Sequence, residues 1–384
     1  MDIFGILSMI GGLALFLYGM EAMGAGLSKL SGGRMERLLE KLTSKRIMAV
    51  LLGAGVTAVI QSSSATTVMV VGFVNSGIMK LNQAVGIIMG ANIGTTITSW
   101  LLSLTGIQGS SFILKMLKPS SFSPILAIVG IIFIMFTKDE KKKDIGGIFL
   151  GFAILMYGME AMSGAVAPLA DNEKFTGILT MFSNPILGLL AGTILTAVIQ
   201  SSSASVGILQ ALCATGAVNF STALPIIMGQ NIGTCVTAII SSIGTSKNAK
   251  RAAAVHLFFN ISGTVIFMVV FYTLNTFVHF SFLNTAASPA GIAVIHSLFN
   301  IGATILLFPF ANLLEKMAIL AIPDKGSEVE EMEEEKINPD LARLDERFLD
   351  KPGFAMEECR GVAINMARKS KKAMNLAIDL LKEY

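Results

Sequence analysis

Two identical stretches of nine residues carry the most concentrated polar chemistry in this sequence. Each reads Thr-Ala-Val-Ile-Gln-Ser-Ser-Ser-Ala, at residues 57–65 and again at residues 196–204. Serine hydroxyls donate and accept hydrogen bonds, and a glutamine amide supplies two donors and an acceptor. Such groups could bind an oxyanion, and their oxygens could also coordinate a hard cation such as sodium. We expect the substrate contacts to come from Gln61, Ser62, Ser63, Ser64, Gln200, Ser201, Ser202 and Ser203.

A second polar motif also occurs twice inside apolar sequence. Residues 90–96 read Gly-Ala-Asn-Ile-Gly-Thr-Thr, and residues 229–234 read Gly-Gln-Asn-Ile-Gly-Thr. Asparagine and threonine between glycines suggest a helix that opens locally and completes the site. The glycines could instead form a close packing surface for a neighbouring helix, and the two roles are compatible. We expect sodium ligands from these motifs and from residues that follow the serines: Thr66, Asn92, Thr95, Thr96, Ser205, Asn231 and Thr234.

The two halves of the chain are copies of one unit. Residues 18–23 and 157–162 both read Tyr-Gly-Met-Glu-Ala-Met, which gives a third matching pair. All three pairs share one offset, because position 18 matches 157, position 57 matches 196 and position 90 matches 229. Chance does not produce three ungapped matches at one offset, so the pattern indicates an internal duplication.

The composition places this duplicated unit in a membrane. Hydrophobic residues make up 53% of the 384 residues and charged residues only 14%, against about 25% charged residues in a soluble domain. The net charge of +3 is too small to argue for nucleic acid. No cysteine lies in a metal-binding pattern, and no nucleophile–base pair suggests an enzyme. We therefore expect an all-α polytopic membrane protein without a cofactor.

A helix needs about 20 apolar residues to cross the bilayer. The stretches 47–77 and 186–218 are long and apolar, but the Gln-Ser-Ser-Ser segment interrupts each of them. Because four consecutive polar side chains are unfavourable against lipid, we predict two re-entrant helical hairpins that are buried in protein or line a cavity. Seven further stretches are predicted to cross the membrane: 4–27, 82–104, 122–137, 145–167, 221–243, 252–275 and 289–310.

Positive charge in the loops predicts the orientation. Loop 29–46 holds six basic residues, whereas the equivalent loop 168–184 holds only Lys174. Loops 138–144 and 244–251 are also basic, and cytoplasmic loops carry an excess of lysine and arginine. The N-terminus is therefore predicted to be external and the C-terminal tail cytoplasmic. Three crossings separate equivalent points of the two repeats, so the repeats are predicted to be inverted relative to each other.

Inverted repeats with paired broken helices are typical of secondary transporters, whose substrates bind near the midplane at the repeat interface. The helix that follows each polar break is expected to begin at the serines, and the free N–H groups at its start favour an anion. No arginine or lysine lies inside the predicted crossings or hairpins, so a bound cation would have to balance an anion. Glu21 and Glu160 lie late in their helices, where we expect snorkelling or pairing. Structural hydrogen bonding is expected for His256 and Asn260, and for the similar pair that begins at His296.

A family resemblance rests on three segments: Gln61-Ser-Ser-Ser-Ala-Thr-Thr, Gly90-Ala-Asn-Ile-Gly-Thr-Thr and the second Gln200-Ser-Ser-Ser. They resemble the type II sodium–phosphate cotransporters and their bacterial relatives, and the resemblance covers about residues 1–311. It implies sodium-driven uptake of inorganic phosphate, with both hairpins facing a central site. The segment from Arg251 to Asn260 also resembles the family's pattern, although the first repeat lacks a counterpart.

These patterns divide the chain into four parts. Residues 1–144 form the first transmembrane repeat, and residues 145–311 form the second repeat with an extra helix. Residues 312–340 are predicted to form an acidic linker, and residues 341–384 a cytoplasmic helical segment. Bacterial relatives often carry a PhoU-like regulatory domain after the membrane part, and Leu344-Asp-Glu-Arg-Phe-Leu resembles the start of one.

The leading hypothesis is a sodium-coupled symporter of inorganic phosphate in the inner cell membrane that works by alternating access. Its expected partners are phosphate, sodium and the lipid bilayer. A second copy of the chain, in a homodimer, is a further candidate partner. One alternative is a sodium-coupled transporter of another oxyanion, such as sulfate or a dicarboxylate. The other is a phosphate exporter or channel that works down the gradient.

Overall fold

The computed structural model describes residues 3–31, 45–107, 119–170, 172–323 and 352–382. In these residues the chain is almost entirely helical, with an isolated bridge between Asn219 and Ala286 as its only strand-like pairing. Six helical segments are long and apolar enough to cross a membrane. They are α1 (Ile3–Ser31), α5 (Leu81–Ser103), α8 (Glu140–Val166), α12 (Phe220–Ser241), α13 (Lys247–Val278) and α14 (Pro289–Leu307), which α15 (Ala311–Ala321) continues.

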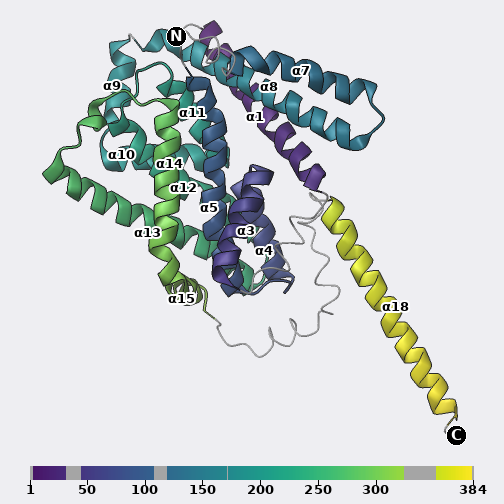
Figure 1. Cartoon of the computed structure of the whole chain (residues 1–384). Coiled ribbons are helices and arrows are strands. Elements are labelled where there is room, and N and C mark those ends of the chain that lie inside the picture. Colours follow the sequence, from purple (N-terminus) through teal and green to yellow (C-terminus); the bar gives the residue numbers. More distant parts are fainter. Residues whose placement is uncertain (1–2, 32–44, 108–118, 171, 324–351, 383–384) are drawn as a thin grey trace.

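Six of the seven predicted crossings are thus confirmed as helices of sufficient length, and one is shorter. The stretch 122–137 corresponds to α7 (Pro119–Phe136), whose apolar part is Ser121–Phe136 and which packs against α8 (Figure 1). Large apolar side chains point outward from the bundle, with Phe136 78% and Phe277 79% exposed. Exposed apolar surface on this scale fits lipid surroundings. Together with the helix lengths, it identifies a multi-pass membrane protein.

Both stretches predicted to be interrupted are broken at the glutamine and first serine of the motif. Residues 47–77 contain α3 (Arg46–Ile60) and α4 (Ser63–Asn75), and residues 186–218 contain α10 (Pro185–Ile199) and α11 (Ser202–Cys213). Ahead of the second pair, α9 (Glu173–Met181) meets α10 at a bend of 97°. Much of the predicted loop 168–184 is therefore helical.

Glycines bring each broken pair against the helix that carries the Asn-Ile-Gly-Thr motif. A Cβ atom on Gly53 of α3 would collide with the carbonyl oxygen of Ile87 in α5. A Cβ atom on Gly90 of α5 would likewise collide with the carbonyl oxygen of Val50. Small residues let helix backbones approach closely, so these glycines have the packing role expected as one of their two functions. Equivalent contacts join α10 and α12: Gly192 with Ile226, and Gly229 with Leu189.

The first long helices of the two repeats also pack through equivalent glycines. Gly12 and Gly19 of α1 correspond, at the offset of the repeat, to Gly151 and Gly158 of α8. A Cβ on Gly12 would lie 3.0 Å from the carbonyl oxygen of Gly158, and a Cβ on Gly151 would lie 2.9 Å from that of Gly19. An early residue of one helix thus lies opposite a late residue of the other. It follows that α1 and α8 are antiparallel.

The end of the bundle that contains Arg251 is more helical than the sequence suggested. Residues 247–251 of the predicted loop 244–251 belong to α13, and residues 311–321, mostly assigned to the linker, form α15. Buried Arg251 donates to the carbonyl oxygen of Ile322 at 2.8 and 3.0 Å and so satisfies the end of α15. Leu314 also buries an apolar face of α15 in the core, which explains why this segment is ordered as a helix.

The C-terminal segment contains α18 (Pro352–Lys382), which confirms the predicted helical spacing and leads away from the bundle (Figure 1). Three predicted features lie outside the described residues. They are most of the basic loop 29–46, the acidic run 328–335 and the PhoU-like segment 344–349.

Candidate functional site

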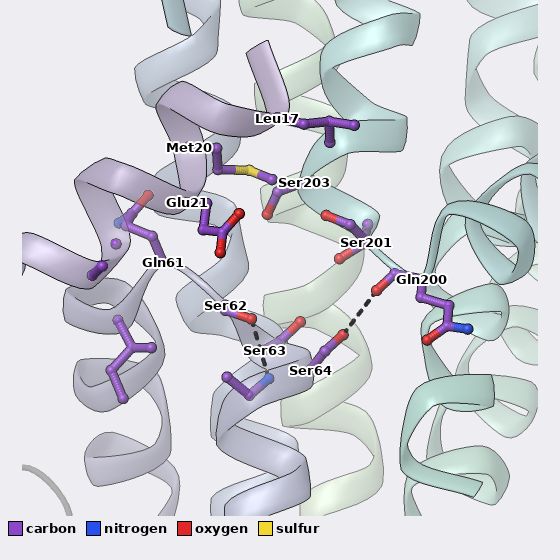
Figure 2. Close-up of a pocket in the computed structure, with 15 residues that line it drawn as sticks. Leu17, Met20, Glu21, Gln61, Ser62, Ser63, Ser64, Gln200, Ser201 and Ser203 are labelled. Carbon is purple, nitrogen blue, oxygen red and sulfur yellow. Dashed lines mark hydrogen bonds between the residues drawn. The ribbon is translucent and has the colours of Figure 1, made fainter. Parts of the chain in front are cut away.

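Both Gln-Ser-Ser-Ser segments border one cavity of about 410 Å³ (Figure 2). The first segment contributes residues 60–65 and the second contributes residues 200–203, so that all eight predicted substrate contacts meet here. The remaining wall is one face of α1, formed by Leu17, Met20, Glu21, Gly24 and Ala25. The fold therefore brings together two segments that lie in different halves of the sequence.

The two breaks have the same backbone conformation. Gln61 and Gln200 end their helices with φ of 61° and 58°, in the left-handed region that costs an L-residue roughly 1–2 kcal/mol. Ser62 and Ser201 follow in extended conformation and cap the next helix. Each hydroxyl accepts a hydrogen bond from the backbone N–H three residues further on, at 3.1 and 3.2 Å. The chain thus turns within two residues, and strain of this kind is concentrated at functional sites.

Helix ends set the electrostatic character of the cavity. α4 and α11 begin there, and their free N–H groups and positive dipole ends favour an anion. α3 and α10 end there, and the last carbonyl groups of a helix suit a cation. The hydroxyl of Ser64 donates to the main-chain carbonyl oxygen of Gln200 at 3.5 Å, which joins the two breaks. Donors for an anion and acceptors for a cation therefore face the same space.

The two glutamines do not have the same surroundings. The side chain of Gln61 is buried; it accepts a hydrogen bond from Thr98 at 2.9 Å and donates to the carbonyl oxygen of Ala58. The side chain of Gln200 is exposed and points away from the serines (Figure 2), and Thr237 donates to its main-chain oxygen at 3.4 Å. Both glutamines border the cavity, but the Gln61 amide is bonded to protein on both sides and the Gln200 amide points away from the serines, so their contact with substrate stays a prediction. The sequence analysis did not predict that Thr98 and Thr237 contact the two glutamines. The signal that could have found them is that these threonines occupy equivalent positions of the two repeats.

The residues predicted to bind sodium are buried but do not border this cavity. Asn92 donates to Asn260 of α13 at 3.0 Å, and the hydroxyl of Ser205 has no hydrogen-bond partner within the described part of the chain. Their assignment as sodium ligands stays a prediction. The others donate to carbonyl oxygens three or four residues earlier in the chain: Thr66, Thr95, Thr96, Asn231 and Thr234.

Glu21 is the charged residue of the cavity wall that sequence reasoning missed. It was expected to snorkel, but α1 places it on the cavity beside both breaks (Figure 2). Its repeat equivalent, Glu160 in α8, is also exposed but does not border the cavity. The repeated Tyr-Gly-Met-Glu-Ala-Met motif could have pointed to this position, because it places a carboxylate in the same apolar context twice.

The buried histidines take part in packing between the central helices. Asn260 donates to the main-chain oxygen of His256 at 2.9 Å, and Asn300 donates to that of His296 at 2.8 Å. Both imidazoles are 1% exposed. Asn260 forms the expected bond between helices, because Asn92 donates to it. The ring nitrogens of His256 and His296 have no hydrogen-bond partner within the described residues, so the structural role predicted for the two histidine side chains stays a prediction.

Comparison with known proteins identifies a family of membrane transporters. The Na+/Pi-cotransporter family model matches residues 15–164 and 154–288. "Uncharacterized protein YqeW" of Bacillus subtilis is 29% identical over 315 residues, which are 82% of this chain and 97% of that protein. "Putative inorganic phosphate export protein YjbB" of Escherichia coli is 26% identical over 323 residues, which are 83% of this chain and 56% of that protein.

A mammalian relative is similar over a shorter stretch. "Sodium-dependent phosphate transport protein 2A" of Rattus norvegicus is 39% identical over 113 residues, which are 28% of this chain and 17% of that protein. This chain thus spans about half the length of YjbB and less of the mammalian protein. No solved structure matches the chain. The family model covers well over half of the chain, and the family consists of transporters, not enzymes. The chain therefore belongs to the Na+/Pi-cotransporter family.

Proposed function

We propose that this protein is a sodium-coupled symporter of inorganic phosphate that works by alternating access. The observation that carries the proposal is the meeting of two serine-capped helix N-termini at one cavity. Each N-terminus offers free N–H groups and hydroxyls to an oxyanion. Similarity to a protein named for sodium-dependent phosphate transport supports the choice of ion and substrate.

The electrostatics of the cavity favour a cation-dependent mechanism. Among the described residues that border it there is no lysine or arginine, so no side chain neutralises a bound phosphate. A bare anion would lose hydration that the helix dipoles replace only in part. Sodium held by nearby carbonyl and hydroxyl oxygens would lower that free-energy penalty.

Phosphate affinity is therefore expected to rise with sodium concentration. Linkage requires that phosphate tighten sodium binding by the same factor, and coupling is typically about 5- to 150-fold. Calorimetry on the purified protein, in sodium and in choline at equal ionic strength, measures this factor directly. Equal phosphate affinities in the two salts would rule out coupling at the binding step.

Export is the second candidate, because the chain is similar to a protein named for phosphate export. Proteoliposomes with labelled phosphate on one side and a sodium gradient in either direction separate the candidates. Symport predicts that phosphate follows the sodium gradient both inward and outward. A flux that is equal with and without the gradient would instead support a down-gradient exporter or channel, and competition by sulfate or a dicarboxylate tests the other oxyanions.

We further infer that the two repeats are inverted in the membrane, so that their broken pairs are re-entrant hairpins that enter from opposite sides. Antiparallel packing of α1 and α8 supports this, because these helices occupy equivalent places in the two repeats. The different surroundings of Gln61 and Gln200 also fit two halves held in different conformations. Exchange of those conformations between the repeats would open the cavity alternately to each side.

Cysteine labelling tests this orientation. In a background with exposed Cys359 replaced by serine, Lys29→Cys should react with an impermeant maleimide only from the cytoplasm. Asn172→Cys should react only from outside. Cys213 and Cys235 are buried and should stay unlabelled in both cases. Reaction of both introduced cysteines from the same side would contradict the inverted arrangement.

A further inference from the structure

The cavity wall contains a carboxylate, Glu21, in addition to the hydroxyls and helix ends described above. Glu21 is exposed to this space, and Figure 2 shows its carboxylate between Gln61 and the serines of the second break. Ion pairs or hydrogen bonds of its side chain are absent within the described residues. A carboxylate is thus turned toward the place where helix N-termini favour an anion.

Two like charges in one small cavity oppose each other. A cavity of about 410 Å³ cannot keep a phosphate and the carboxylate far apart. Two unit charges about 8 Å apart, at an effective dielectric constant of about 20, repel enough to weaken binding roughly 30-fold. An ionised Glu21 is therefore compatible with bound phosphate only when a cation compensates for one of the two charges.

The packing of α1 places the main-chain oxygen of Ile60 beside the helical turn that follows Glu21. A Cβ on Gly24, one helical turn after Glu21, would lie 3.1 Å from the main-chain oxygen of Ile60. Ile60 is the last residue of α3, and the final carbonyl groups of a helix have no partner within it. Hard cations prefer carboxylate and carbonyl oxygens as ligands. Glu21 and the end of α3 together offer that ligand set at the edge of the anion site.

We propose that Glu21 binds the sodium ion that admits phosphate to the cavity, together with carbonyl oxygens at the end of α3. The proposal rests on the symport function proposed above and names the residue that makes phosphate entry depend on sodium. Without sodium the carboxylate repels phosphate. With sodium bound, the ion neutralises the carboxylate and attracts the anion.

Glu160 provides a matched control. It occupies the equivalent position in the second repeat and is exposed, but it does not border the cavity. Glu160→Gln removes the same charge from the same sequence context, and is expected to leave the ratio of phosphate dissociation constants in choline and sodium unchanged.

The experiment measures phosphate binding by calorimetry in sodium and in choline for the wild type, Glu21→Gln and Glu160→Gln. Glu21→Gln should bind phosphate about 10- to 30-fold more tightly than the wild type in choline, because the repulsion is removed. Its affinity should change little when sodium replaces choline. Titration of sodium alone should show a binding heat for the wild type and Glu160→Gln that Glu21→Gln lacks.

Several outcomes would overturn the assignment. Tighter phosphate binding by Glu21→Gln in sodium and choline alike would show a carboxylate that repels phosphate without binding sodium. If the ratio of phosphate dissociation constants in choline and sodium were the same for Glu21→Gln as for the wild type, Glu21 would only line the cavity. The proposed symport would still stand in that case, provided that the wild type binds phosphate in a sodium-dependent way. Loss of sodium dependence in Glu160→Gln as well would overturn the specific role of Glu21. Absence of sodium dependence in the wild type would rule out coupling at the binding step, and with it this role of Glu21, whereas the flux measurement in proteoliposomes tests symport itself.

Discussion

Replacing Gly53 with alanine is expected to destabilise the protein by about 3 kcal/mol or more and to abolish transport, because overpacking that forces backbone shifts commonly costs about 1–3 kcal/mol and occasionally more. The added Cβ would collide with the main-chain carbonyl oxygen of Ile87, and backbone cannot yield as the end of a flexible side chain can. Since Gln61 directly follows the last residue of α3, a displaced α3 would also displace the first break from the cavity. Thermal unfolding followed by size-exclusion chromatography, with phosphate uptake measured in parallel, checks both effects.

Gly55→Ala is the matched control for this prediction. Gly55 lies two residues further along α3, and a Cβ there would meet no atom within 4 Å. Alanine is favoured over glycine in a helix by about 1 kcal/mol, so this variant should be as stable as the wild type or slightly more so. Similar losses of stability in Gly53→Ala and Gly55→Ala would show that α3 tolerates no substitution at all and that the contact with Ile87 is not the cause. Gly192→Ala should reproduce the Gly53→Ala result in the second repeat, because its Cβ would collide with Ile226.

Removing the hydroxyl of Ser62 or Ser201 is expected to weaken phosphate binding about 10- to 150-fold, because loss of one buried hydrogen bond to a charged partner costs roughly 1.5–3 kcal/mol. Each hydroxyl oxygen accepts a bond from its own helix N-terminus, which leaves its hydrogen available to a bound oxyanion. Calorimetric titration with phosphate in saturating sodium measures the effect, and wild-type affinity in both variants would show that the serines only cap their helices.

Two further variants separate binding from capping. Alanine at an N-cap position destabilises a helix by about 1 kcal/mol, whereas glycine at this position costs only a few tenths. Ser62→Gly should therefore keep the start of α4 and still lose phosphate affinity. Ser76→Ala is the control at the other end of the same helix, because Ser76 donates to the carbonyl oxygen of Gly72 and lies away from the cavity. Its phosphate affinity should match that of the wild type.

Local features of the sequence were sufficient to predict the helices and their interruptions. Apolar length defines a crossing, and four polar residues inside an apolar stretch mark a break wherever the chain folds. The breaks occur at Gln61 and Gln200 as predicted, and the structure adds that left-handed backbone is followed there by a capping serine in both repeats. The prediction was less accurate at the edges of the bundle. α7 is shorter than a full crossing, and α15 occupies part of the predicted linker, because Arg251 and buried apolar contacts stabilise it.

The sequence by itself determined the duplication, the membrane class and the residue types that border the cavity, because repeats, apolar length and polar motifs are read along the chain. Only the tertiary structure decided how these parts combine. Close glycine contacts between backbones place the broken helices beside α5 and α12, and the antiparallel pair α1 and α8 joins the two halves. As a result both breaks share one cavity, Glu21 borders it while Glu160 does not, and Gln200 points away. Residues in equivalent sequence surroundings acquire different neighbours here because α1 borders the cavity and α8 does not, and no pattern within a single repeat contains that difference.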